Sequence, residues 1–218
     1  MNGGGSVASP RKVNNLLALA VLSYLTAGPK HPYELGRLLR EHGDDRSIKF
    51  NHGSLYMVVR QLAKVGFIIE QETTRAGQRP ERTVYALTDA GRNELRDWLR
   101  ELVEEPQHEY PHFVAALSLI AALPPSEVVE LLGRRLGRLA EQRAEIRELV
   151  DSTLAEGVHP LFLVEEDYRL ALVDAESVFV ERFIERITHP ETGWGQLWAE
   201  HHGEPAGEPA ITNEGNQP

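Results

Sequence analysis

The stretch GSLYMVVRQLAKVGFI, residues 53–68, limits the possible folds most, because a helical pattern and a strand pattern meet there at one glycine, Gly66. The apolar residues of the helical part recur at steps of three and four: Leu55, Val58, Val59 and Leu62. The opposite side then carries Met57, Arg60, Gln61 and Lys64. This polar side fits either a solvated surface or a surface that contacts a partner.

The neighbouring segments place this helix third in a series. NNLLALAVLSYLTAG is apolar on nearly all sides, and HPYELGRLLREHG has Pro32 in its first turn and Gly43 as a stop. Two β-rich runs joined by the polar turn AGQRPER follow, and Asn51 and Thr88 are suited to cap the third helix and the helix after the hairpin. The order helix, helix, helix, hairpin, helix predicts a winged helix-turn-helix domain over residues 13–105.

The second half of the chain predicts helices only. A short apolar helix is followed by two long ones, and the first long helix carries a heptad-like seam that includes Arg143. Long amphipathic helices in so small a region need a second surface to pack on, so we expect residues 111–188 to form a helical dimerisation and effector domain. A monomeric helical hairpin is the alternative. The fold class is then mainly α with a small β-hairpin (α+β).

Both ends of the chain have the composition of unstructured segments. We expect residues 1–12 to be a disordered arm and residues 189–218 to be a flexible acidic tail. The sequence contains no cysteine, which excludes thiolate chemistry and disulfides. Its longest apolar run, residues 113–123, is too short to cross a bilayer. We therefore expect a cytoplasmic protein that does not contact a membrane.

The formal net charge of −10 hides a strong asymmetry. Residues 1–100 contain 15 Lys and Arg against 10 Asp and Glu, whereas residues 101–218 contain 8 against 23. A basic front half attached to an acidic back half favours a nucleic-acid contact made by the front half alone.

A helix that enters the major groove touches bases mainly with its N-terminal part, and Arg and Gln can each form paired hydrogen bonds with a base. The arginine-rich turn beside it suits phosphates or the minor groove, and Arg11 and Lys12 would add phosphate contacts from the arm. The candidate DNA-binding residues are His52, Ser54, Tyr56, Met57, Arg60, Gln61, Lys64, Arg75, Arg79 and Arg82.

HPYELGRLL, HGSLYMVVRQLAKVGFI and RPERTVYALTDAGRNEL, in this order, resemble the PadR family of bacterial transcriptional regulators. The resemblance is close over residues 14–105 and extends by helix pattern over 111–187, as in the subfamily with a longer C-terminal helical domain. It implies a homodimer on a palindromic operator of double-stranded DNA, acting as a repressor that an effector releases. Gly53, Ser54, Leu55 and Tyr56 match the family's recognition-helix motif, whereas Met57 replaces the proline common there.

A winged-helix module that binds proteins and not DNA is the alternative function. We expect no enzyme, cofactor or metal site, because the sequence has no phosphate loop, nucleophile signature or zinc pattern. A small aromatic or apolar effector is a further expected partner. The candidates for its pocket are Trp98, Tyr110, Phe113, Tyr168 and Phe179, although aromatic residues at helical spacing more often simply pack in a core.

Overall fold

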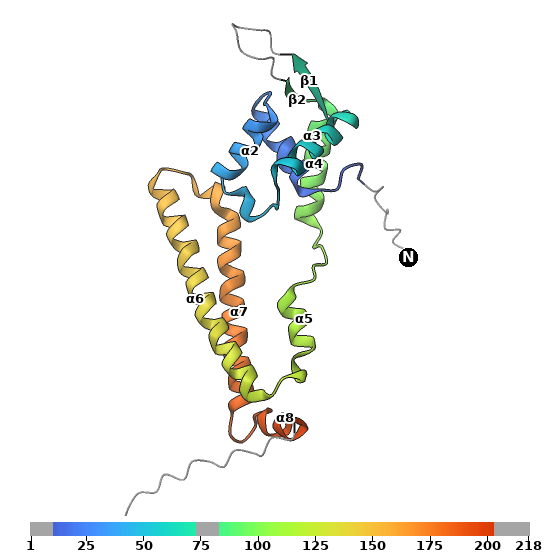
Figure 1. Cartoon of the computed structure of the whole chain (residues 1–218). Helices are drawn as coiled ribbons and strands as arrows, with labels where there is room; N and C mark the ends of the chain where they lie inside the picture. Colours follow the sequence, from blue (N-terminus) through green and yellow to red (C-terminus); the bar gives the residue numbers. More distant parts are fainter. Residues whose placement is uncertain (1–10, 73–82, 203–218) are drawn as a thin grey trace, which may run out of the picture. The chain divides into compact units, whose positions relative to one another are not determined.

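A computed structural model describes residues 11–72 and 83–202, which form two compact units, residues 1–108 and 109–218. Within the described ranges the chain is mostly helical with one two-stranded antiparallel sheet, so the predicted fold class is confirmed (Figure 1). None of the helices in these ranges is both long and apolar enough to span a membrane.

The first unit has the element order of a winged helix-turn-helix. Its elements are α1 (Leu16–Tyr24), a 3-10 turn (Leu25–Ala27), α2 (Pro32–Glu41), a second 3-10 turn (Asp44–Arg46), α3 (His52–Lys64), β1 (Ile68–Glu72), β2 (Thr83–Leu87) and α4 (Asp89–Glu104). The strands pair in the register Ile68 with Leu87 and Glu72 with Thr83. Lys30 also pairs with Tyr85, which joins the loop after α1 to the sheet.

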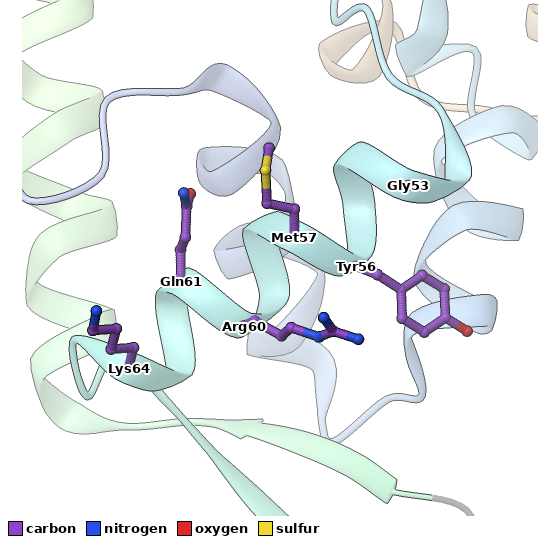
Figure 2. Close-up of a pocket in the computed structure, with 6 residues that line it drawn as sticks. All are labelled: Gly53, Tyr56, Met57, Arg60, Gln61 and Lys64. Carbon is purple, nitrogen blue, oxygen red and sulfur yellow. The ribbon is translucent and has the colours of Figure 1, made fainter.

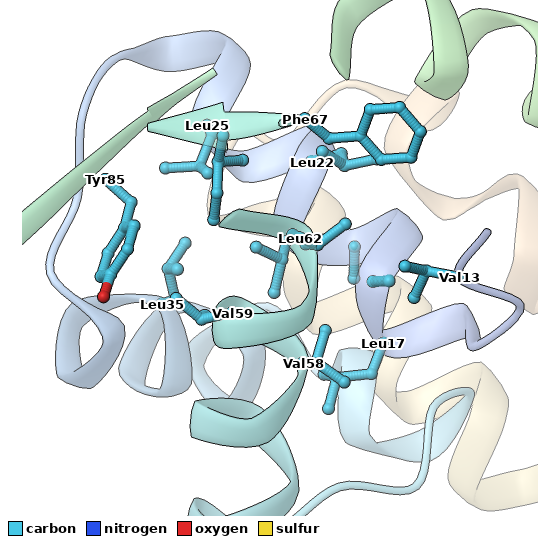
Figure 3. Packing of buried hydrophobic residues seen from close by; sticks show 14 of the residues in the cluster. Val13, Leu17, Leu22, Leu25, Leu35, Val58, Val59, Leu62, Phe67 and Tyr85 are labelled. Carbon is cyan, nitrogen blue, oxygen red and sulfur yellow. The ribbon is translucent and has the colours of Figure 1, made fainter. Parts of the chain in front are cut away.

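One hydrophobic core holds this unit together. Leu17 and Leu22 of α1, Leu35 of α2 and the buried stripe of α3 meet in it, and Figure 3 shows these side chains directed toward one another. The predicted stripe of Leu55, Val58, Val59 and Leu62 is fully buried. Because α3 packs on α1 and α2 along its buried side, its opposite side faces outward.

Two glycines and two caps set the ends of α3 and α4. Asn51 caps α3 as predicted, and Gly66 has φ 81°, a left-handed conformation that ends the turn after α3. Thr88 caps α4 by accepting a hydrogen bond from the Gly91 amide at 3.0 Å, while its hydroxyl donates to the Gly66 carbonyl oxygen at 2.8 Å. The path from α3 through β1 to α4 is therefore fixed by local hydrogen bonds.

The second unit is built on an antiparallel pair of long helices. Its elements are α5 (His112–Ser118), a 3-10 turn (Ile120–Ala122), α6 (Pro125–Ala155), a 3-10 turn (Pro160–Leu163), α7 (Val164–Thr188) and α8 (Gly195–His202). Figure 1 shows α6 and α7 side by side. Val128 and Leu132 pack with Val180 and Ile187 near one end, and Leu139 and Ile146 pack with Val173 further along.

Ion pairs cross between α6 and α7. Arg143, the polar member of the predicted seam, lies 2.5 Å from a carboxylate oxygen of Asp174, and Arg135 lies 2.5 Å from Glu176. The seam residues of α6 therefore have packing and ion-pair partners on α7 of the same chain. A second copy, if present, has to use other faces.

The prediction that residues 189–218 form a flexible tail was wrong for the first part of this range, because α8 lies there. Trp198 packs on the cluster around Val128 and Val180, and the Trp194 amide donates to the Arg186 carbonyl oxygen at 2.8 Å. That prediction rested on the composition of the last residues. The two tryptophans bury enough apolar area to hold the segment against α6 and α7.

Candidate DNA-reading helix

The side of α3 that faces away from the core forms a shallow groove of about 420 Å³. Figure 2 shows the residues that line it: Gly53, Tyr56, Met57, Arg60, Gln61 and Lys64. Met57, Arg60, Gln61 and Lys64 are exposed, and Tyr56 is half-buried. Five of these six are candidate DNA-binding residues, so five of the seven candidates on α3 lie on one face.

The start of α3 is fixed by a capping box. The Asn51 side chain accepts a hydrogen bond from the Ser54 amide at 2.8 Å, and the Ser54 hydroxyl accepts one from the Asn51 amide at 2.8 Å. The same hydroxyl donates to the Asn51 carbonyl oxygen at 2.9 Å. The side chain of Ser54 thus serves the helix terminus, and this candidate residue orients α3.

An aromatic cluster surrounds the first turn of α3. The ring of His52 lies edge-on to Tyr56, with centroids 5.3 Å apart, and to Tyr33 of α2, with centroids 6.3 Å apart. Tyr33 is exposed at the N-terminal end of α2 and was not among the predicted residues. HPYEL shows only that Tyr33 follows the proline that starts α2, and its contact with the start of α3 depends on how α2 and α3 pack.

Tyr85 borders the same face from the sheet. Its hydroxyl donates to a carboxylate oxygen of Glu70 at 3.0 Å, across the paired strands. Burial raises the pKa of Tyr85, and the hydrogen bond to Glu70 raises it further, whereas the nearby charge of Arg60 lowers it. Tyr85 therefore keeps its proton at neutral pH and holds the side chain of Glu70 by this hydrogen bond.

Five basic residues predicted to contact DNA are not part of the α3 face. Arg75, Arg79 and Arg82 lie outside the described residues. Arg11, predicted as a phosphate contact on a flexible arm, is instead bound within the first unit: it pairs with Glu94 at 2.6 Å and with Glu101, and its guanidinium lies 5.3 Å from the centre of the Trp98 ring. Lys12 lies 5.9 Å from the centre of the Phe67 ring. The prediction of an arm at Arg11 and Lys12 was therefore wrong.

The candidate effector residues are not gathered in one pocket. Trp98 is 3% exposed and packs in the core of the first unit. Tyr110 and Tyr168 are 86% and 66% exposed and line neither of the two cavities beside Phe113 and Phe179. Phe113 and Phe179 do meet, edge to face, with centroids 6.4 Å apart.

A cavity lies on each side of this phenylalanine pair. Phe113 lines one of about 550 Å³ together with Arg134, Arg135 and Arg138. Phe179 lines another of about 550 Å³. Arg135 lies over the Phe113 ring with its guanidinium carbon 3.6 Å from the ring centre. A lining that combines apolar side chains with guanidinium groups is chemically suited to a flat, partly acidic molecule. In the described ranges no three His, Asp or Glu side chains gather as metal ligands.

Comparison with known proteins supports this interpretation of the first unit. Residues 21–97 match the model of the "Transcriptional regulator PadR-like family". The negative transcriptional regulator PadR of Bacillus subtilis strain 168 is 29% identical over 142 residues, which cover 63% of this chain and 76% of the relative.

Solved structures of Bacillus subtilis PadR share the fold. The structure in complex with operator DNA has a TM-score of 0.63 at 22% identity, covering 78% of this chain and 97% of that one. The structure in complex with p-coumaric acid has a TM-score of 0.62 at 20% identity, covering 78% and 94%. The family model, the curated relative and the shared fold agree with the geometry of α3. Residues 21–97 therefore form a domain similar to that of the PadR-like family of transcriptional regulators.

Proposed function

We propose that this regulator binds a palindromic operator as a homodimer, represses transcription, and is released by a small aromatic or apolar effector. The observation that carries the proposal is the outward face of α3. It presents Arg60, Gln61 and Lys64 from a helix that is capped at its start and packed on its other side. Rigid presentation of such groups is what base reading in a major groove requires.

Each side chain has a distinct part in this proposal. Arg60 and Gln61 contact base edges, because their planar groups can form paired hydrogen bonds with guanine and adenine. Lys64, near the end of α3, contacts phosphate, and His52 and Tyr56 contact the backbone beside the first turn. Arg75, Arg79 and Arg82 of the hairpin turn enter the proposal on sequence alone, as contacts to phosphate or the minor groove.

The homodimer is supported by an apolar stripe on α7 that α6 does not cover. Val164, Tyr168, Leu172, Ala175 and Phe179 recur at steps of three and four and are all exposed in the single chain. An exposed stripe of this length on a long helix is typical of an interface. Two chains related by a two-fold axis present two copies of α3, which requires an operator with matching two-fold symmetry.

Repression and release by an effector are proposed by analogy with the relatives. The Bacillus subtilis relative is named a negative regulator, and its solved structures include one with p-coumaric acid. In this chain Phe113 and Phe179, with the cavities beside them, are the described candidates for an apolar ligand. A ligand there releases the DNA if it binds better to a conformation in which the two α3 helices are wrongly spaced.

The proposal is tested with duplex DNA from upstream of the protein's own gene, labelled for fluorescence anisotropy. Specific binding that weakens steeply with salt is expected. Arg60→Ala is expected to reduce the preference for the specific site, while Arg100→Ala, an exposed arginine on α4 paired with Asp97 of its own helix, serves as the matched control. Equal affinity for specific and unrelated duplexes, or no binding at moderate salt, would contradict the proposal and favour a protein-binding module.

A further inference from the structure

Met57 occupies a central place on the outward face of α3. At about 100° per residue, Met57 and Arg60 each lie within roughly 30° of the line opposite the buried stripe, whereas Tyr56 and Gln61 lie further round. In Figure 2, Met57 and Gln61 extend from one edge of α3, and Arg60 and Tyr56 extend from the other. Met57 and Arg60 are therefore the side chains of the middle turn that reach furthest outward.

The turn before Met57 leaves this face open. Gly53, one turn earlier, has no side chain, and a β-carbon there would contact only the Asn51 side chain, at 3.3 Å. Lys64, which also faces outward, lies two turns later, about 10 Å along the helix axis. No side chain in the first turn of this face keeps Met57 away from the floor of a groove.

Exposure alone is not informative, since single apolar side chains are common on protein surfaces. Met57 is 51% exposed, and it is the only aliphatic member of the six residues that line the groove. Its flexible thioether side chain makes no hydrogen bond to a base edge and instead contacts apolar groups. In the major groove the apolar group of a base pair is the 5-methyl group of thymine.

We infer that Met57 recognises the 5-methyl group of a thymine in each operator half-site. This inference rests on the proposed function of α3 and names one base that it reads. Met57 and Arg60 are three residues apart, so their β-carbons are about 5–6 Å apart. Successive base pairs are about 3.4 Å apart along the duplex, which places the thymine within about two base pairs of the guanine that Arg60 contacts.

The test starts with selection of bound sequences from a random duplex pool by the full-length protein. The selected half-site is expected to contain a thymine within about two base pairs of a guanine. Replacing that thymine with deoxyuridine removes only the methyl group. It is expected to weaken binding about fourfold, the effect of burying one such group at about 0.8 kcal/mol. Deoxyuridine at a thymine outside the half-sites is the matched control and is expected to have no effect.

Two variants then tie the methyl group to the side chain. Met57→Ala and Met57→Gln are expected to bind the thymine and deoxyuridine duplexes equally. The double-mutant cycle then assigns the whole thymine preference of the wild-type protein to coupling between Met57 and the methyl group. Met57 makes no part of the buried core, and circular dichroism checks that both variants fold. The deoxyuridine comparison on the wild-type protein stands even if a variant fails to fold.

The outcomes separate the inference from the proposed function. If the pool enriches a site and deoxyuridine binds as well as thymine, or no thymine is selected near the guanine, the role of Met57 is overturned while DNA binding stands. If both variants still bind the thymine duplex more tightly than the deoxyuridine duplex, another residue reads the methyl group, and the role of Met57 is again overturned. If the pool enriches no sequence, the proposed function fails, and the inference fails with it.

Discussion

A β-carbon on Gly91 would lie 2.1 Å from the carbonyl oxygen of Phe67. The first turn of α4 therefore packs directly on the backbone where α3 ends and β1 begins. Thr88 fixes this contact from both sides, since its amide donates to the Phe67 carbonyl oxygen at 3.1 Å and its hydroxyl accepts from the Gly91 amide. This is the structural reason for the Leu-Thr-x-x-Gly pattern after the hairpin, and it couples α4 to the position of α3.

Gly91→Ala is expected to lower the free energy of unfolding by about 1–3 kcal/mol, because an added methyl group forces the backbone of Phe67 to move. Gly137→Ala is the matched control. A β-carbon at Gly137 would meet nothing within 4 Å in the middle of α6, so this change is expected to stabilise by about 0.5–1 kcal/mol. Urea denaturation measures the free energy of unfolding of both variants. Unchanged stability of Gly91→Ala would contradict the close packing.

Arg11→Ala distinguishes a structural arginine from a DNA contact. Loss of the ion pairs with Glu94 and Glu101 and of the stacking on Trp98 is expected to destabilise the first unit by about 1–2 kcal/mol. The salt dependence of DNA binding is expected to stay unchanged. Lys64→Ala, in contrast, is expected to reduce the salt slope by about one ion and leave stability unaltered. A reduced salt slope for Arg11→Ala would contradict this structural role and would support the original prediction that Arg11 contacts phosphate.

The tyrosine at the end of α1 predicts how stability changes at alkaline pH. Burial raises the pKa of Tyr24, and the hydrogen bond that its hydroxyl donates to Asp44 raises it further. The folded protein then holds this proton more tightly than the unfolded chain, whose tyrosine pKa is about 10. Stability is therefore unaffected by this group below about pH 10 and falls as pH rises above it.

Tyr24→Phe is expected to make this alkaline loss of stability less steep, while Tyr85, whose pKa is also raised, retains part of it. Chemical denaturation from neutral pH to about pH 11, above the ordinary tyrosine pKa, measures the difference between the variant and the wild-type protein. The outcome against this prediction is a pair of curves that fall in parallel above about pH 10.

Leu172→Glu tests the proposed dimer. Leu172 is 52% exposed in the middle of the α7 stripe, so a carboxylate there would be buried without a partner in a symmetric interface. The variant is expected to be a monomer in sedimentation velocity and to lose roughly tenfold or more in affinity for a two-site operator, because the second half-site no longer binds cooperatively. Val103→Glu, at an 87% exposed position on α4, is the matched control and is expected to remain dimeric.

The sequence alone determined the features that depend on neighbours three or four residues apart. The helical spacing around Leu55 and Val58 gave the buried and outward sides of α3, and Asn51 and Thr88 gave the starts of two helices. Capping and amphipathic spacing are local effects, because the groups involved lie within one or two turns of each other. Helical spacing by itself therefore suffices to collect five of the seven candidate residues of α3 on one face.

The tertiary structure decided the partners of side chains that are distant in sequence. Arg11 reaches Glu94 and Glu101 across 83 and 90 residues, and this contact makes a predicted arm part of the first unit. Trp98 and Trp198 also found packing partners that no local pattern identifies. An amphipathic pattern states that a face is apolar, but which surface covers that face depends on how the whole chain packs. Burial against any apolar surface of fitting shape stabilises the fold, whatever the position of that surface in the sequence.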